Sequence, residues 1–388
     1  MSRFLFVVPP LVGHTLPTVA VGQALTARGH QVGWAGHPET VGPLLSPGSR
    51  LIPVAANFGG QTLAQARRRS LGLRGAAAHR FLWADFLIPL ATSMVPGVAA
   101  AVDEFTPDAL VVDQHTLAGA LVARQRRLPW ATSATTSAEL TDQVASAPRQ
   151  GMWAQQCMAH LQRDLAVSNP VDLRFSDHLV LAFTTPTLVG SVWDFPSHYK
   201  FVGPAMGPRP AWLEFPWDWL RSDREHVLIS LGTVNQNVGR RFFATAMQAV
   251  APLADRLQAI FAAPPDLVDP PPGHVLIREF VPQLDLLPYL HSVVSHAGHN
   301  TVCEALAHGV PLVVAPIRDD QPMIAGQVVD AGAGVRVHFG RIGPTELRNA
   351  ITTVLDNPSY RTAAWRVQTS FAAAGGAAAA ADHVEKLL

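Results

Sequence analysis

The chain has 388 residues, a length that suits two domains of about 150–200 residues each. Hydrophobic residues make up 48% of it and charged residues 15%, which is typical of a folded enzyme with a large core and excludes an intrinsically disordered chain. The formal net charge is +0, so the composition gives no sign of a nucleic-acid partner. The two cysteines, Cys157 and Cys303, form neither a disulfide framework nor a CxxC metal motif.

The first apolar run, Phe4-Leu5-Phe6-Val7-Val8, is followed by Pro9-Pro10. It is shorter than the core of a signal peptide and predicts a buried strand. No stretch approaches the roughly 20 apolar residues that a membrane-spanning helix needs. We therefore expect a cytoplasmic protein, either a monomer or a homodimer, and leave a loose membrane contact open.

The first half of the chain alternates short apolar segments with longer helical ones. Such alternation is typical of a parallel sheet covered by helices on both faces. The expected strands are Phe4–Val8, Gln31–Ala35, Leu51–Val54, Ala109–Asp113 and Trp130–Ser133, and the expected helices include Leu16–Arg28, Phe81–Val102 and Thr116–Arg127.

A histidine follows the first expected strand, on the loop that carries the run Gly13-His14-Thr15-Leu16-Pro17. An alcohol is a weak nucleophile until it loses its proton, and an imidazole with a pKa near neutrality can accept that proton. His14 is therefore a candidate general base. The alternative is a histidine that caps or orders the following helix.

An acidic residue, Asp113, ends the apolar strand Ala109–Asp113 and faces the same sheet edge as His14. Its carboxylate could accept a hydrogen bond from the second imidazole nitrogen and stabilise the imidazolium, as the aspartate of a catalytic triad does. The alternative is an N-cap for the following helix. Asp108 competes for the role, and His115 lies two residues further on.

A proline- and glycine-rich run, Gly203–Pro210, predicts a linker, because neither a helix nor a central strand continues through it. Strand–helix alternation resumes beyond it. We expect domains at residues 1–203 and 223–365, a linker at 204–222 and a C-terminal helix at 366–388. The expected strands of the second half are Val227–Leu231, Leu257–Phe261, Val275–Ile277, Val293–Ser295, Leu312–Ala315 and Gly334–Val337.

The turn Ser230-Leu231-Gly232-Thr233 follows the first strand of the second half. A turn of this kind lets backbone N–H groups meet a phosphate. It is not GxGxxG, and no such fingerprint opens either half, which argues against an NAD site. Taken alone, the tetrapeptide is a generic turn.

The most informative segment covers residues 281–321. It predicts a strand at Ser292–Ser295, a tight turn at His296–Asn300 and a helix at Thr301–His308. A strand, a glycine-containing turn and a helix start together present free N–H groups and a positive dipole end to an anion. The segment therefore predicts a diphosphate site, to which side chains can also donate from His296, His299, Asn300 and Thr301.

This segment resembles the donor-binding signature of the family 1 glycosyltransferases, the UDP-glycosyltransferase superfamily. Plant members read His-Cys-Gly-x-Asn-Ser, and many bacterial antibiotic members read His-Gly-Gly-x-Gly-Ser/Thr. This chain reads His-Ala-Gly-x-Asn-Thr from His296, with Asp320-Gln321-Pro322 downstream. It is most similar to bacterial zeaxanthin and natural-product glucosyltransferases, and the resemblance extends from Gly13-His14 to at least Gly334.

The resemblance implies the α/β GT-B fold, in which two Rossmann-like domains face each other across a cleft and the C-terminal helix crosses back. It implies that His14 is the catalytic base and Asp113 its partner. Phe280 stands where the family stacks an aromatic ring on the pyrimidine, although core packing is the alternative for it. The remaining donor-binding residues that it implies are Gly232, Thr233, Val281, Gln283, His296, Gly298, Asn300, Thr301, Glu304, Asp320 and Gln321.

The identity of the donor depends on Glu304, a carboxylate that can accept hydrogen bonds from both ribose hydroxyls. Relatives that use dTDP-sugars often lack an acid there, and their ribose has no 2′-hydroxyl, so Glu304 favours UDP. The alternative is a helix-dipole partner in the first turn of its helix. Asp320 and Gln321 match the family's contacts to sugar hydroxyls, and glutamine favours glucose.

The sequence indicates the residues that contact the acceptor substrate less clearly than those that bind the donor. The resemblance implies that helices of the first domain line an apolar acceptor pocket, while core packing is the usual meaning of aromatic residues at helical spacing. No metal or other cofactor is expected. The acceptor-binding residues that we expect are Phe81, Trp83, Phe86, Met152 and Trp153.

The sequence therefore predicts an inverting glycosyltransferase that moves a hexose, with glucose favoured, from UDP to a hydroxyl of a lipophilic small molecule. The alternatives are a dTDP-deoxysugar transferase of antibiotic biosynthesis, a UDP-sugar 2-epimerase on the same fold, and a degenerate relative that only binds nucleotide. The intact pair of His14 and Asp113 argues against the last.

Overall fold

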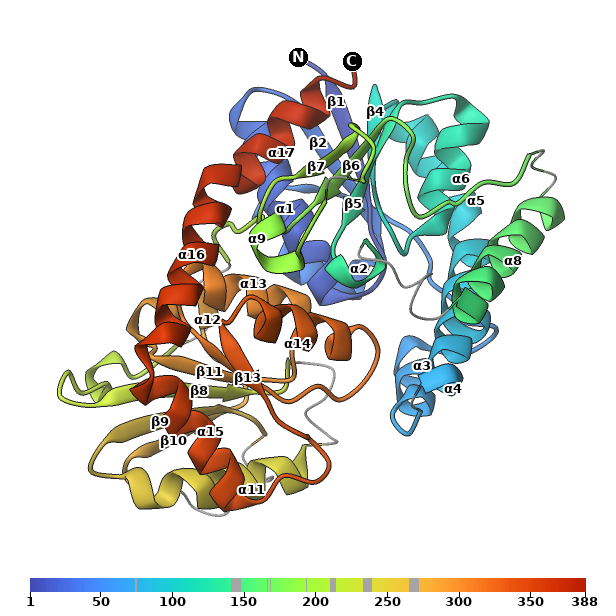
Figure 1. Cartoon of the computed structure of the whole chain (residues 1–388). Helices are drawn as coiled ribbons and strands as arrows, with labels where there is room; N and C mark the ends of the chain where they lie inside the picture. Colours follow the sequence, from blue (N-terminus) through green and yellow to red (C-terminus); the bar gives the residue numbers. More distant parts are fainter. Residues whose placement is uncertain are drawn as a thin grey trace. The chain divides into compact units, whose positions relative to one another are not determined.

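A computed structural model describes residues 1–73, 75–140, 148–165, 167, 169–192, 194–209, 214–232, 239–264 and 272–388 (Figure 1). The chain folds into two compact units. Unit 1 consists of Met1–Thr185, Ser191–Pro210 and Ala374–Leu388, and unit 2 consists of Pro186–Gly190 and Ala211–Ala373.

Unit 1 is built on a seven-stranded parallel sheet in the order β3-β2-β1-β4-β5-β6-β7. Its strands are β1 (Arg3–Val7), β2 (Gln31–Gly36), β3 (Arg50–Pro53), β4 (Ala109–Asp113), β5 (Trp130–Ala134), β6 (Leu179–Ala182) and β7 (Tyr199–Phe201). Its helices are α1 (Val12–Ala27), α2 (Pro38–Val41), η1 (Gly42–Leu44), α3 (Leu63–Ser70), α4 (Gly75–Arg80), the π-helix η2 (Phe81–Leu87), α5 (Ile88–Phe105), α6 (Leu117–Arg126), η3 (Ser137–Glu139), α8 (Pro148–Asp164) and α17 (Gly376–Glu385).

The order of the strands in unit 1 reverses at β1. The chain runs from β1 outward to β2 and β3, and then returns to place β4 on the other side of β1. Every residue of β4 is buried, as expected for a central strand that helices cover on both faces. A reversal of this kind leaves a gap at the carboxyl ends of the two strands, where ligands of open α/β sheets bind. In unit 1 this position lies between the ends of β1 and β4.

The last helix, α17, belongs to unit 1 and packs against α1 (Figure 1). The backbone N–H of Gly376 donates to the carbonyl of Val202 at 2.7 Å, and Ala380 and Ala381 are buried in the core. The predicted return of the C-terminus to the first unit is therefore present, but it begins at Ala374 rather than at residue 366.

Unit 2 is built on a six-stranded parallel sheet in the order β10-β9-β8-β11-β12-β13. Its strands are β8 (Glu225–Ser230), β9 (Leu257–Ala262), β10 (Val275–Arg278), β11 (Ser292–Ser295), β12 (Leu312–Val314) and β13 (Gly334–Arg336). Its helices are α9 (Pro186–Val189), η4 (Trp217–Trp219), α11 (Arg240–Val250), η6 (Ala251–Leu253), α12 (Gln283–Leu286), η8 (Leu287–Tyr289), α13 (His299–Ala307), α14 (Gln321–Asp330), α15 (Pro344–Asp356) and α16 (Pro358–Ala374).

Unit 2 repeats the reversal of unit 1, here between β8 and β11. Unit 2 also differs from the predicted domain at 223–365. It includes Pro186–Gly190, whose Leu188 packs into its core, and it extends to Ala373 because α16 buries Val367 and Phe371 there. The second passage of the chain from unit 1 to unit 2, between residues 210 and 211, falls inside the segment predicted as a linker.

In the described part of the chain, one helical run, Gly75–Phe105, is long and apolar enough to cross a membrane by length and composition. The expectation that no stretch approaches such a length is therefore wrong. The core helix of a globular domain passes the same test, and Leu90, Met94 and Val98 of this run are buried in the core of unit 1.

Candidate active site

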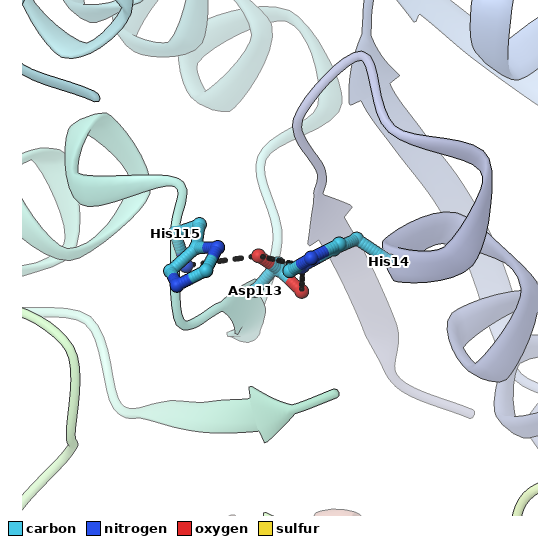
Figure 2. Close-up of side chains that lie close together, drawn as sticks. All are labelled: His14, Asp113 and His115. Atoms are coloured by element: carbon cyan, nitrogen blue, oxygen red, sulfur yellow. Dashed lines mark hydrogen bonds and ion pairs between the residues drawn. The ribbon is translucent and has the colours of Figure 1, made fainter. Parts of the chain in front are cut away.

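His14 and Asp113 lie side by side at the reversal of the first sheet (Figure 2). His14 Nδ1 is 3.0 Å from each carboxylate oxygen of Asp113. The carboxylate is fully buried, while the His14 side chain is 18% exposed. His14 is not on a loop, as its sequence context predicts, but is the third residue of α1, which begins at Val12. Asp113 is the last residue of β4 and does not cap a helix, because α6 begins only at Leu117.

A third residue, Thr135, contacts both His14 and Asp113. Its hydroxyl lies 2.8 Å from Asp113 Oδ2, to which it donates, and 2.8 Å from His14 Nδ1. The backbone N–H of His115 also donates to Asp113 Oδ1 at 2.9 Å. Because a carboxylate can only accept, the proton of neutral His14 belongs on Nδ1. Nε2 then carries the free lone pair that a general base needs.

His14, Asp113 and His115 each offer a possible metal-ligand atom, and these atoms lie within 4.8 Å of one another. However, His14 Nδ1 and Asp113 are at hydrogen-bond distance from each other, and His115 Nε2 is 2.9 Å from Glu139 Oε1. These distances are those of two hydrogen-bonded histidine–carboxylate pairs. We therefore interpret the cluster as proton-handling groups.

The second cluster of predicted residues lies in unit 2, at the reversal between β8 and β11. His296 follows β11, and its ring lies between two glycines. A Cβ on Gly232 would come within 2.6 Å of His296 Cε1, and a Cβ on Gly298 within 2.5 Å of His296 Nε2. Both distances are shorter than an ordinary van der Waals contact. A side chain at either position would therefore press on the His296 ring, and glycine at both positions leaves its Nε2 edge uncovered.

His296 is suited to donate a hydrogen bond without carrying a charge. Burial lowers its pKa to about 4, against the opposing influence of Asp320, and Arg318 lowers it further. Its Nδ1 is buried and has no hydrogen-bond partner among the described residues. Nε2 is therefore the nitrogen that can meet a ligand, and an Nε2–H group can donate to a phosphate oxygen.

The helix after this turn begins at His299, two residues earlier than predicted, with Gly298 at its N-cap. The preceding residue, Ala297, is held at a φ of 66°, a left-handed conformation that costs a non-glycine residue about 1 kcal/mol. Asn300 and Thr301 therefore lie in the first turn, where N–H groups lack helical partners and favour an anion.

The early start of the helix places Glu304 in its second turn, so the predicted first-turn position was wrong. A carboxylate interacts favourably with the helix dipole only in the first turn of a helix, so the position of Glu304 argues against the helix-dipole alternative. Glu304 is 5% exposed, and its Oε2 accepts a hydrogen bond from Gln283 Nε2 at 2.6 Å. The two residues, predicted separately, form one hydrogen-bonded pair that joins α12 to α13.

The other predicted donor residues lie after β10 and at the start of α14. Phe280 is 44% exposed, so it is not a core residue, and the half-buried Val281 accepts a backbone hydrogen bond from Gln283 at 2.8 Å. Asp320 is the N-cap residue of α14, and Gln321 is buried with its Oε1 accepting from the backbone N–H groups of residues 317 and 318. Thr233 lies outside the described residues.

The expected acceptor residues fall into two groups. Phe81, Trp83 and Phe86 are buried in the core of unit 1, at 8%, 1% and 6% exposure, which favours core packing, the alternative for them. Met152 is exposed, and Trp153 is half-buried with its ring 5.9 Å from that of His79. Only the α8 residues remain as candidates for acceptor contact.

Sequence reasoning missed two residues that contact this cluster, Thr135 at His14 and Glu139 at His115. Thr135 follows the end of β5, which neighbours β4, so the argument that identified Asp113 would also have identified Thr135. Glu139 lies in a single 3-10 turn further on and carries no motif. Its contact with His115 depends on how the loop after β5 folds back, which no local pattern predicts.

Two units, each built on a parallel α/β sheet with polar groups at its reversal, define the class of GT-B proteins. The solved glycotransferase of kitacinnamycin has the same fold, with a TM-score of 0.79, 24% identity, and coverage of 100% of this chain and 99% of that one.

A profile of the family described as "UDP-glucoronosyl and UDP-glucosyl transferase" matches residues 206–370. The 4'-demethylrebeccamycin synthase of Lentzea aerocolonigenes is 29% identical over 421 aligned residues, covering 100% of both chains. The uncharacterized UDP-glucosyltransferase YojK of Bacillus subtilis (strain 168) is 30% identical over 294 residues, covering 71% of this chain and 72% of that one. The chain belongs to this family and is a glycosyltransferase.

Proposed function

We propose that this protein moves a hexose, most simply glucose, from UDP to a hydroxyl of a lipophilic small molecule, with inversion at the anomeric carbon. The observation that carries the proposal is the buried contact between His14 and Asp113 at the reversal of the first sheet. The carboxylate and Thr135 hold the Nδ1 edge, which leaves Nε2 to remove the proton of an acceptor hydroxyl.

In the proposed reaction the acceptor O–H bond breaks and its proton goes to His14 Nε2. The oxygen forms a bond to the anomeric carbon while the bond from that carbon to the diphosphate breaks, with the electron pair leaving on the diphosphate. Asp113 stabilises the imidazolium that results. The products are the glycoside and a nucleoside diphosphate.

On the donor side, we propose that the leaving diphosphate is bound by His296 Nε2 and by the N–H groups at the start of α13. A neutral histidine, a helix N-terminus and the hydroxyl of Thr301 supply hydrogen bonds where charge develops. These groups can take the place that a divalent metal holds in other nucleotide-sugar enzymes, so we propose metal-independent transfer.

The proposal of UDP over dTDP depends on Glu304. Its buried carboxylate is fixed by Gln283 through a 2.6 Å hydrogen bond, so its orientation is set before a ligand arrives. A fixed carboxylate can accept from two vicinal ribose hydroxyls at once, and deoxyribose offers only one of them. Asp320 and Gln321 are the groups that we propose contact the sugar hydroxyls.

For the acceptor we propose only a chemical class, that of small lipophilic molecules with a hydroxyl. The related 4'-demethylrebeccamycin synthase carries the name of a natural product, and the exposed Met152 and half-buried Trp153 offer apolar surface to a small lipophilic molecule. A cytoplasmic location follows as part of the proposal, because nucleotide sugars are made there.

Calorimetric titration with UDP, UDP-glucose and dTDP-glucose, without metal, tests the donor. We expect UDP and UDP-glucose to bind more tightly than dTDP-glucose, and Glu304→Ala to weaken UDP binding by about tenfold and dTDP-glucose binding by less, because deoxyribose offers Glu304 one hydroxyl fewer. Asp330→Ala, which removes an exposed carboxylate at the far end of α14, is the control. Equal or tighter dTDP binding would refute the choice of UDP and favour a deoxysugar donor; absence of binding to all three would refute the transferase proposal.

A further inference from the structure

A second histidine lies against the proposed base. The rings of His115 and His14 are stacked, with centroids 4.8 Å apart and planes inclined by 30° (Figure 2). His115 follows β4 and is 8% exposed. The pair of His14 and Asp113 explains proton transfer without it, so the position of His115 requires its own explanation.

His115 is anchored on its far side by a buried carboxylate. Its Nε2 lies 2.9 Å from Oε1 of Glu139, whose side chain is 8% exposed. Arg174 approaches the other oxygen of Glu139 at 3.4 Å and is itself bound by Asp172 at 2.6 Å. The ring of His115 therefore has one face on His14 and one edge fixed to a charged network.

Glu139 is ionised throughout the physiological range. Burial raises its pKa, but the charges and hydrogen bonds of His115 and Arg174 outweigh burial and hold the pKa at about 2. A buried carboxylate that stays charged keeps a hydrogen-bond donor beside it, and here that donor is the Nε2–H group of His115. The anchor thus persists at every pH at which His14 can act as a base.

The polar contacts of His14 among the described residues restrain only one edge of its ring. Nδ1 is equidistant from both oxygens of Asp113 and also contacts Thr135, so these contacts fix the Nδ1 edge and do not reach the Nε2 edge. A base must reach the acceptor hydroxyl to within hydrogen-bond distance, and an error of an ångström in its position is costly in rate. A ring packed on one face of His14 limits tilting of the Nε2 edge.

We propose that His115, fixed by Glu139 and Arg174, is a positioning residue that holds the imidazole of His14 in the orientation that presents Nε2 to the acceptor. The inference rests on the proposed role of His14. Among the described residues, the charged or titratable groups in contact with His115 include Asp113, Glu139 and His14, and Arg174 and Asp172 extend the network beyond Glu139.

Two substitutions at His115 distinguish the effect of its stacked ring on kcat from the effect of its hydrogen bond to Glu139. We expect His115→Ala to lower kcat about tenfold and to leave the KM for the donor unchanged, because the donor residues lie in unit 2. His115→Phe restores the stacked ring and should recover kcat to within about threefold of the wild type. The matched control is His178→Gln, an exposed histidine of the same unit. Transfer is followed with 4-methylumbelliferone and either UDP-glucose or dTDP-glucose.

The NMR resonances of His14 give a readout that needs no turnover. Because the ring of His115 stacks on that of His14, His115→Ala should shift the His14 ring-carbon resonances, and His115→Phe, which keeps a stacked ring, should shift them less. Spectra of protein labelled at the histidine ring carbons show these resonances, with that of His14 assigned by its loss in His14→Gln.

The outcomes distinguish the inference from the function on which it rests. A wild-type kcat in His115→Ala, or a kcat in His115→Phe no better than in His115→Ala, would overturn the positioning role. An inactive wild type with every donor would count against the proposed function, and the His14 resonances would still decide the inference: His14 resonances that are unchanged in His115→Ala would refute it.

Discussion

Gly298 offers the sharpest test of the donor site, because a Cβ at this position would press on a single neighbouring side chain, that of His296. A Cβ at this position would lie 2.5 Å from His296 Nε2, whereas ordinary contact begins at 3.4 Å, so the ring must retreat by about 0.9 Å. The φ of Gly298 is −66°, which alanine adopts without strain. The effect of Gly298→Ala is therefore steric and is directed at the nitrogen proposed to bind the diphosphate.

The expected loss is that of one hydrogen bond to a charged group, about 1.5–3 kcal/mol, or roughly 10- to 150-fold in Kd. Calorimetry with UDP and dTDP measures it, since both nucleotides share the diphosphate. A small loss of thermal stability is also expected, because alanine is a poorer N-cap than glycine.

Gly326→Ala is the matched control. Gly326 lies inside α14, where a Cβ meets nothing within 4 Å, so this substitution should leave Kd unchanged and stabilise the helix by up to about 1 kcal/mol. Wild-type affinity of folded Gly298→Ala for both nucleotides would show that His296 Nε2 does not bind the diphosphate.

Three further predictions concern the base, the fold and acid stability. His14→Ala and Asp113→Asn should each lower kcat by about 10²- to 10⁴-fold with little change in donor affinity, and transfer should persist in EDTA; loss of activity on chelation would instead indicate a metal at this cluster. Gly334→Ala places a Cβ against the carbonyl oxygen of Leu312 and should cost at least about 1–3 kcal/mol in urea unfolding, whereas Gly340→Ala, whose nearest neighbour would be 3.8 Å away, should be nearly neutral. Folding lowers the pKa of Glu139 from 4.5 to about 2. The ionised carboxylate therefore adds about 3 kcal/mol to the free energy of unfolding above pH 4.5, and this contribution is lost as the pH falls toward 2. Glu139→Gln should flatten this part of the stability–pH curve, and an unchanged slope would contradict it.

The local pattern of the sequence determined the two parallel sheets and most of their strands. Apolar runs such as Ala109–Asp113 are buried on both faces and can hardly form anything but central strands. The same reasoning identified Asp113, because a charged residue at the end of such a run must lie at the edge of the sheet. Motif resemblance then indicated which strand ends carry chemistry.

The residues at which helices begin were harder to predict from the sequence. The helices containing His14 and Asn300 begin earlier than expected, because a helix start depends on backbone geometry at one or two residues, such as the left-handed Ala297. The aromatic residues of Phe81–Leu87 were ambiguous for another reason. Helical spacing shows that they share a face, and only packing shows that this face meets the core of unit 1.

The sequence by itself thus determined the family, the two sheets and the residues that follow their strands. Only the tertiary structure decided which of these residues touch: His14 Nδ1 with Asp113, Gln283 with Glu304, and His115 with Glu139. The physical reason is that strand order, not chain order, sets which strand ends are neighbours. β1 and β4 pair across a hundred residues of intervening chain, and nothing local to either strand records the other.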